Sequence, residues 1–230
     1  MLLKITGLKK KFKDHEVLNG IDLEIEPGQI VGLLDSNGAG KSTLMKCIND
    51  LLVPDEGEIL VNGIPFNKNS HLLISYLPEK TYLDPSWKAK NAIDFFAKYY
   101  PDFDRNKAMD LLKDLDLNPE QEIKNMSKGM QEKLQLALVM SRNARLYMLD
   151  EPLGGVDPVS RDRILDTILS HFSEESSMII STHMISEIER ILDRALILQD
   201  GKIILDENAE ELRARTGHSV NEEFREVYRS

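Results

Sequence analysis

QIVGLLDSNGAGKST, residues 29–43, is an apolar run followed at once by a glycine-rich loop that leads into Lys41 and Ser42. Residues 29–34 predict a buried strand, and residues 41–52 predict a helix that Pro54 ends. The loop between them matches the phosphate-binding pattern G-x-x-x-x-G-K-[ST] except at its first position, where Asp35 replaces glycine. The strand before the loop and the helix after it are the context that this pattern requires.

In a loop of this kind, backbone N–H groups and the positive end of the helix surround phosphate oxygens. We expect Lys41 to reach the terminal phosphates of a nucleotide and the Ser42 hydroxyl to ligate Mg²⁺. The residues predicted to bind the nucleotide are Asn37, Gly38, Ala39, Gly40, Lys41, Ser42 and Thr43. An ordinary turn followed by a helix cap is the alternative, and four further blocks of sequence argue against it.

The first block is the apolar run 146–149, which ends in the carboxylates of Asp150 and Glu151. A buried strand delivers its terminal acid to the carboxyl edge of an α/β sheet, where ligands bind. We predict that Asp150 holds Mg²⁺ and that Glu151, one residue on, polarises the attacking water. An Asp-Glu pair alone is weak support for a nucleotide site, but behind a phosphate-binding loop it is strong support.

The other three blocks follow in a consistent order. Ser127 is well placed as the N-cap of a helix, and a helix start that carries a free hydroxyl and Gly129 is also an anion site. Asp157 followed by proline predicts another helix start. His183 ends a β-branched strand, and its position after the acid pair favours a catalytic role over a structural one.

Together these blocks resemble the nucleotide-binding subunit of an ATP-binding cassette (ABC) transporter over roughly residues 1–205. The sequences of its motifs are most similar to those of bacterial drug- and peptide-antibiotic exporters whose ATPase is separate from the membrane subunits. The residues behind this closer similarity are 76–79 (YLPE), 99–104 (YYPDFD), 127–130 (SKGM) and 181–184 (STHM).

The resemblance implies that residues 126–130 are the family's signature sequence, at the start of a helix. It also implies that two such chains, identical or different, sandwich two ATP molecules, each bound by one chain's phosphate loop and the other chain's signature helix. Ser127 and Gly129 would then touch the γ-phosphate of the partner's ATP, and His183 would probe the γ-phosphate at its own site. Phe12 matches the aromatic residue that stacks on adenine, although an exposed or core phenylalanine fits the sequence nearly as well.

Three residues depart from the family pattern. Asp35 replaces a glycine that lies close to phosphate; a carboxylate about 7 Å from phosphate weakens binding by on the order of 1 to 2 kcal/mol, or about tenfold. We therefore expect weakened ATP binding, provided that the side chain turns outward. Glu79 stands where the family usually has glutamine and can still ligate Mg²⁺ through oxygen. Lys128 replaces a signature glycine, either near the partner's γ-phosphate or as a solvated lysine.

Composition restricts the class of protein further. The chain has 230 residues, 41% of them hydrophobic, and a formal net charge of −10, which disfavours a broad nucleic-acid-binding surface. No apolar run approaches the ~20 residues that span a bilayer, so a transporter role needs integral membrane permease subunits on other chains. We expect a cytoplasmic protein, held peripherally at the inner face of the membrane by those subunits.

The periodicity predicts an α/β fold: a P-loop NTPase core with an antiparallel β edge and an inserted α-helical subdomain. We expect one domain over 1–230, with the core at 1–84 and 146–205, the helical subdomain at 85–145 and a helical tail at 206–230. Further strands are predicted at 17–25, 57–61, 72–77 and 177–182 and in a hairpin of 195–198 with 202–205. Further helices are predicted at 89–100, 104–115, 158–172 and 184–193.

The sequence thus predicts an ATP- and Mg²⁺-dependent hydrolase that powers export of a drug, peptide or similar amphiphile. Glu151 is the expected general base, and Ser42, Glu79 and Asp150 are the expected metal ligands. One alternative is a subunit with impaired hydrolysis, suggested by Asp35, that acts as a regulatory partner. The other is a soluble ABC ATPase outside transport, which the acidic charge and the short 41–127 interval disfavour.

Overall fold

The larger sheet of the molecule is mainly parallel, so the carboxyl ends of its strands lie at one edge, where a ligand site can form. The structure is a computed structural model that describes residues 1–35, 38–67 and 69–228. Within these residues the strand order is β10-β9-β3-β8-β7-β6. The strands are β3 (Ile30–Leu34), β6 (Ile74–Leu77), β7 (Leu146–Asp150), β8 (Ser177–Thr182), β9 (Arg194–Gln199) and β10 (Lys202–Asn208). All neighbours pair in parallel except β9 and β10, which form an antiparallel hairpin.

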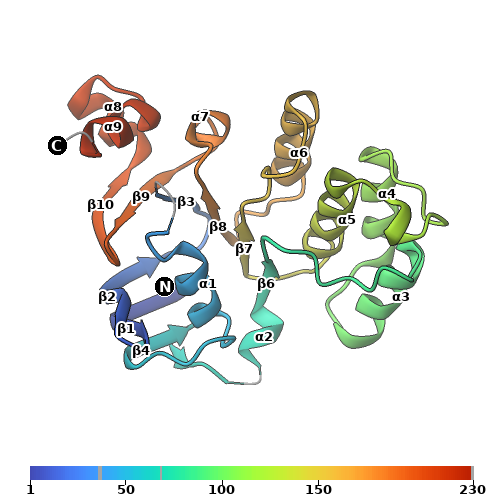
Figure 1. Cartoon of the computed structure of the whole chain (residues 1–230), viewed down its shortest axis with the longest axis horizontal. Helices are drawn as coiled ribbons and strands as arrows, with labels where there is room; N and C mark the ends of the chain where they lie inside the picture. Colours follow the sequence, from blue (N-terminus) through green and yellow to red (C-terminus); the bar gives the residue numbers. More distant parts are fainter. Residues whose placement is uncertain (36–37, 68, 229–230) are drawn as a thin grey trace.

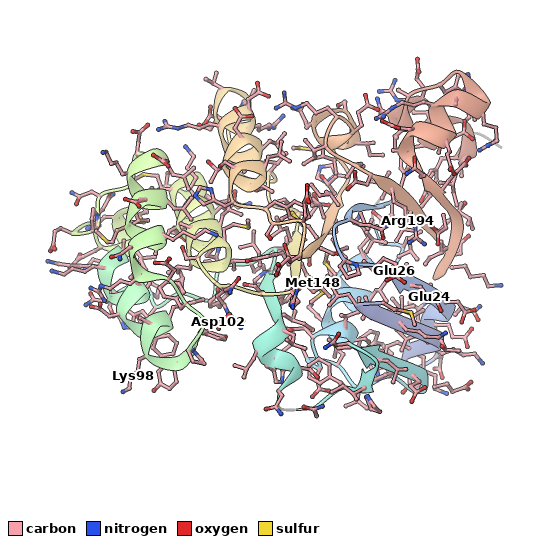
Figure 2. All side chains as sticks on the ribbon, turned by 180° about the vertical axis from the view of Figure 1, so that it is seen from behind. Glu24, Glu26, Lys98, Asp102, Met148 and Arg194 are labelled. Atoms are coloured by element: carbon pink, nitrogen blue, oxygen red, sulfur yellow. The ribbon has the colours of Figure 1, made fainter. Side chains whose placement is uncertain are left out.

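A second sheet is antiparallel and lies beside the first, at the N-terminal end of the chain (Figure 1). Its order is β2-β1-β4-β5, with β1 (Leu3–Phe12), β2 (His15–Ile25), β4 (Glu56–Val61) and β5 (Ile64–Pro65). Arg194 on β9 donates to the backbone oxygen of Glu24 on β2 at 2.7 Å, and both residues are labelled in Figure 2. The predicted antiparallel β edge is therefore present and is tied to the main sheet.

The central strands are buried on both faces, which explains their continuous apolar sequences. Every residue of β3, β7 and β8 is buried. Side chains alternate between faces: one set, including Leu33 and Met148, packs with α1 (Lys41–Ile48), and the other, including Leu34 and Leu149, packs with α5 (Lys128–Met140). The phosphate-loop helix and the helical subdomain therefore cover opposite faces of one sheet.

The inserted helical subdomain forms a group at one side of the sheet (Figure 1). It consists of α3 (Ala89–Tyr99), α4 (Arg105–Asp114), the 3₁₀ turn η1 (Ile123–Asn125) and α5. Asp104 caps α4 by accepting from the backbone N–H groups of Asn106 and Lys107, as predicted. Ser127 caps α5 by accepting from the backbone N–H of Met130 at 3.2 Å.

Some predicted boundaries are wrong. The helix after the glycine-rich loop ends at Ile48 rather than Leu52, because Asp50 has a positive φ of 56° that stops it. The predicted strand 72–77 begins as a helix, α2 (Ser70–Leu73), and only then becomes β6. The predicted helix 184–193 is limited to α7 (Ile185–Ile188).

The remaining helices lie close to their predicted positions. Residues 158–172 contain α6 (Pro158–Ser170), which Asp157 caps through the N–H of Ser160. The tail forms α8 (Ala209–Thr216) and α9 (Val220–Val227), although its first residues extend β10 instead of starting a helix. Tyr228 anchors the end of the tail by donating its hydroxyl to the backbone oxygen of Leu198.

Arg142 joins the helical subdomain to the sheet. It is 4% exposed and pairs with Asp102, which Figure 2 shows between the helices and β6. Its guanidinium also donates to the backbone oxygens of Ile74 at 2.6 Å and Leu72 at 3.1 Å and lies 4.1 Å from the ring centre of Tyr100. One buried cation thus satisfies acceptors from the start of β6 and from the helical subdomain.

We predict that Arg142→Met lowers the free energy of unfolding by about 3 kcal/mol, because it leaves Asp102 and the backbone acceptors without their donor. Arg145→Met is the matched control, since Arg145 follows three residues later but is about half exposed. The control should change stability by less than about 0.5 kcal/mol. Urea unfolding of both variants measures these changes. Equal losses of unfolding free energy in the two variants would contradict the role of Arg142 in connecting the helical subdomain to the sheet.

Candidate active site

A cleft of about 370 Å³ opens where the parallel strands end. The pairing of Asp150 with Ser181 and of Leu34 with Thr182 brings the ends of β7, β8 and β3 to the same edge of the sheet. Most of the predicted site residues line this cleft: Gly38, Gly40, Lys41, Ser42, Thr43, Glu79, Glu151 and His183. The structure therefore gathers residues that are more than a hundred positions apart in the sequence.

The glycine-rich loop has the backbone that its sequence predicts. Gly40 is the N-cap of α1 with a φ of 109°, and a Cβ placed there would lie 2.8 Å from the backbone oxygen of Val17. Only glycine fits this position, because both the conformation and the space exclude a side chain. Gly38 also has a positive φ, of 87°. Asn37, which the sequence predicts to bind the nucleotide, lies outside the described residues.

The side chain of Asp35 turns inward. The expectation of merely weakened ATP binding assumed that this side chain turns outward, and that assumption is wrong. Its side chain is 1% exposed and forms an ion pair with Lys41, whose side chain is 7% exposed. The second carboxylate oxygen accepts from the backbone N–H of Ala39 at 3.1 Å. Burial lowers the pKa of Lys41, while the carboxylates of Glu151, Asp150 and Glu79 act in the opposite direction. The lysine of the phosphate loop is therefore paired with a carboxylate from the same loop.

Glu151 is held at the mouth of the cleft by the end of β8. One of its oxygens accepts from the Thr182 hydroxyl at 3.2 Å and lies 3.0 Å from Nδ1 of His183; the other is 3.8 Å from Nζ of Lys41. Its φ of 52° is unusual for a glutamate and turns the chain out of the strand directly after Asp150. This turn separates the two acids, so that Glu151 lines the cleft while Asp150 stays buried.

Asp150 is fixed by two hydroxyl donors. The Ser181 hydroxyl donates to one of its oxygens, and the Tyr76 hydroxyl lies 3.4 Å from the other. Burial, together with the Asp150 and Glu79 carboxylates, raises the pKa of Tyr76, so the phenol is protonated at neutral pH. Asp150 is 2% exposed, so these two hydroxyl groups hold its carboxylate in place.

The helical subdomain contributes Lys128 and Glu132 to the same cleft. Burial raises the pKa of Glu132, while Lys128 and the backbone N–H of Gly155 act to lower it. The predicted residues Ser127 and Gly129 flank Lys128 at the start of α5, where Ser127 is exposed. Phe12 is not brought to the cleft: it ends β1, is 45% exposed and carries Lys10 Nζ 5.7 Å from its ring centre.

The residues present fit a nucleotide with a divalent cation. The loop offers a glycine-lined backbone and the start of a helix to phosphate, which is the chemistry that binds polyphosphate. The Ser42 hydroxyl and the Asp150 and Glu79 carboxylates are hard oxygen donors, which suit Mg²⁺. In the part of the chain that the structure describes, no cluster of three or more His, Cys, Asp or Glu side chains is arranged to hold a metal alone.

Sequence reasoning missed several contributors to this site, among them Glu132 on α5. Thr182 and Ser181 orient Glu151 and Asp150, and Tyr76 approaches Asp150 from the neighbouring strand. The hydroxyl pair directly before His183 was an available signal. Tyr76 carried a signal as well, because side-chain alternation places it on the same face as Met148 and Asp150 once the β6–β7 register is known.

Comparison with known proteins agrees with this geometry. The ABC transporter family profile matches residues 18–154. The ABC transporter ATP-binding protein YtrB of Bacillus subtilis is 30% identical over 91% of this chain and 74% of its own length. The SkfA peptide export ATP-binding protein SkfE of the same species is 30% identical over 89% and 88%. The daunorubicin resistance ATP-binding protein DrrA3 of Streptomyces coeruleorubidus is 29% identical over 94% and 71%.

Solved structures share the fold. An ATP-binding subunit of an ABC transporter superimposes with a TM-score of 0.89 at 25% identity, covering 99% of this chain and 100% of that chain. The dimeric bacterial ABC transporter cassette MJ0796 gives a TM-score of 0.81 at 21% identity, covering 90% and 98%. No helix among the described residues is long and apolar enough to cross a bilayer. The P-loop NTPase fold is confirmed, and the chain belongs to the ABC transporter family as one of its ATPase cassettes.

Proposed function

We propose that this chain binds and hydrolyses ATP with Mg²⁺ in order to power export of a drug, peptide or similar amphiphile through membrane subunits on other chains. The observation that carries the proposal is the meeting of Lys41, Glu151 and His183 in one cleft behind a phosphate loop. The names of DrrA3 and SkfE support the substrate class, since they refer to drug resistance and peptide export.

We assign the following roles to the residues of the site. Lys41 and the backbone of Gly38 to Gly40 hold phosphate, with Thr43 beside them, and Ser42, Glu79 and Asp150 hold Mg²⁺. The metal supplies charge neutralisation to the phosphates when it is bound. Glu151 accepts the proton of the attacking water, and Thr182 and His183 orient its carboxylate. His183 is about half exposed, which leaves it free to contact phosphate directly.

The complete site requires a second cassette, identical or different. Ser127 and Gly129 lie at the start of α5, and Ser127 is exposed. A capped helix start with an exposed hydroxyl suits a phosphate that another chain presents. The dimeric state of the cassette MJ0796 supports this arrangement. The core, the helical subdomain and the tail act together as one ABC ATPase domain in this proposal.

A groove of about 380 Å³ between α1, β6 and the helical subdomain suits the membrane subunit. Exposed Leu51 and Tyr82 line it together with Tyr76, Phe96 and Tyr100, so its wall is largely apolar and aromatic. An amphipathic segment of a membrane subunit would cover this surface and hold the chain at the cytoplasmic face of the membrane. Trp87 lies near the same side, half-buried against Phe95 at 5.1 Å between ring centres.

Glu151→Gln tests the hydrolytic role. We expect turnover to fall on the order of 10²–10⁴-fold with ATP still bound, because the amide keeps the shape and the Thr182 contact but cannot take a proton. ATP hydrolysis and the size of the variant in solution with and without Mg-ATP are the measurements, and ATP-dependent dimerisation is expected. Glu187→Gln, on α7 and outside the cleft, is the control and should keep its turnover.

Leu51→Asp tests the groove. Co-purification with the membrane subunit should fall at least about tenfold, since a charge would be buried against an apolar partner. Val53→Asp is the matched control, because Val53 is 73% exposed but does not line the groove. If both variants reach the membrane fraction equally, the groove is not the docking surface. If the parent chain never reaches the membrane, a soluble ABC ATPase outside transport becomes the better proposal.

A second candidate function is a regulatory partner with an impaired site, and the contact between Asp35 and Lys41 favours it. In that case the chain would pair with a different, fully active cassette and hydrolyse little ATP alone. Substantial ATP hydrolysis by the isolated chain would exclude this candidate. Its absence in the parent chain, with recovery in Asp35→Gly, would favour it.

A further inference from the structure

We propose that the Asp35 carboxylate is an internal substitute for phosphate, which holds the phosphate-binding groups of the nucleotide-free chain and makes the site selective for metal-bound nucleotide. This inference rests on the proposed nucleotide site and specifies which ligands it accepts. It concerns a residue at which the phosphate-loop pattern has glycine and therefore no side chain.

The contacts of Asp35 are those that a phosphate group would make. One carboxylate oxygen pairs with Nζ of Lys41, and the other accepts from the backbone N–H of Ala39. Both donors belong to the loop that is expected to hold phosphate, and Asp35 and Lys41 line the same cleft. A nucleotide must therefore compete with Asp35 for groups that the chain already uses.

The fold keeps Asp35 in this position. Val31 and Leu33 on β3 face the α1 side of the sheet, so alternation directs Asp35 to that side as well. There it lies against the start of α1, with 1% of its side chain exposed. A buried carboxylate needs a partner, because an unpaired charge is costly in this environment. The ion pair therefore stabilises the loop when no ligand is bound.

Charge determines which ligand can displace the carboxylate. A phosphate group that approaches Lys41 also approaches Asp35, and the repulsion grows with the net charge of the ligand. A divalent cation cancels part of that charge, so metal-bound ATP meets less repulsion than metal-free ATP or inorganic phosphate. Asp35 therefore discriminates against metal-free polyphosphate. A loop with glycine at this position has no side-chain charge and would not discriminate in this way.

The test compares Asp35→Asn and Asp35→Gly, both in a Glu151→Gln background that stops hydrolysis during the measurement. Asparagine keeps the shape and removes the charge, and glycine restores the phosphate-loop pattern. The control is Asp102→Asn, which removes a carboxylate from the ion pair with Arg142, away from the cleft. Dissociation constants are measured by calorimetry for ATP with Mg²⁺, ATP with EDTA and inorganic phosphate, and melting temperatures are measured without ligand.

We expect Asp35→Asn to bind Mg-ATP about tenfold more tightly than the parent with Asp35 does. The gain in affinity for metal-free ATP should be about ten times larger than the gain for Mg-ATP. Without ligand, its melting temperature should fall by roughly 5–10 °C, because Lys41 loses its buried partner. Asp35→Gly should shift both quantities in the same directions. Asp102→Asn should lower the melting temperature and leave all three dissociation constants unchanged.

Several outcomes would reject the inference. Unchanged or weaker nucleotide binding by both Asp35 variants rejects it, while Mg-ATP binding by the parent keeps the proposed function. Equal gains for metal-bound and metal-free ATP reject the selectivity. Tighter binding with no fall in melting temperature means that Asp35 does not hold the loop of the nucleotide-free chain. If neither the parent nor any variant binds ATP, the proposed function and the inference fall together.

Discussion

The parallel pairing of β8 between β3 and β7 is the constraint on which the site depends. This register sets Ser181 opposite Asp150 and Thr182 opposite Leu34, so hydroxyl groups from one strand reach the acids of the next and His183 reaches Glu151. A shift of one residue would turn Ser181 to the opposite face of the sheet and remove the donor to Asp150. Complete burial of the three strands on both faces makes such a shift costly.

Two neighbouring acids, Asp150 and Glu151, obtain different environments from one local change in backbone. Asp150 stays in the strand, buried and held by hydroxyl donors, which suits a group that must keep a fixed position. Glu151 leaves the strand through its positive φ and reaches the cleft, with Lys41 and His183 on either side of its carboxylate. A single pair of dihedral angles thus leaves one acid in the strand and places its neighbour in the cleft.

Much of the fold and site could be predicted because the signals are local. The loop 35–43, the acids after an apolar run and the caps Ser127 and Asp157 each depend on short stretches of sequence. The inward turn of Asp35 was not predicted, because Ala39 and Lys41 face its carboxylate only once the loop has folded against the start of α1. The contact of Tyr76 with Asp150 depends on how β6 pairs with β7. The helix α2 was mistaken for strand because Leu72 and Leu73 fit either pattern over so few residues.

The joint at Arg142 has a mechanical consequence. Its guanidinium binds the first residue of β6 through the oxygen of Ile74, and β6 carries Tyr76 only two residues further on. Because β6 is short and is held at its first residue, we expect it to move as one rigid unit. Movement of the helical subdomain against the sheet would therefore act first on β6, whose Tyr76 hydroxyl lies 3.4 Å from Asp150, the carboxylate proposed to hold the metal.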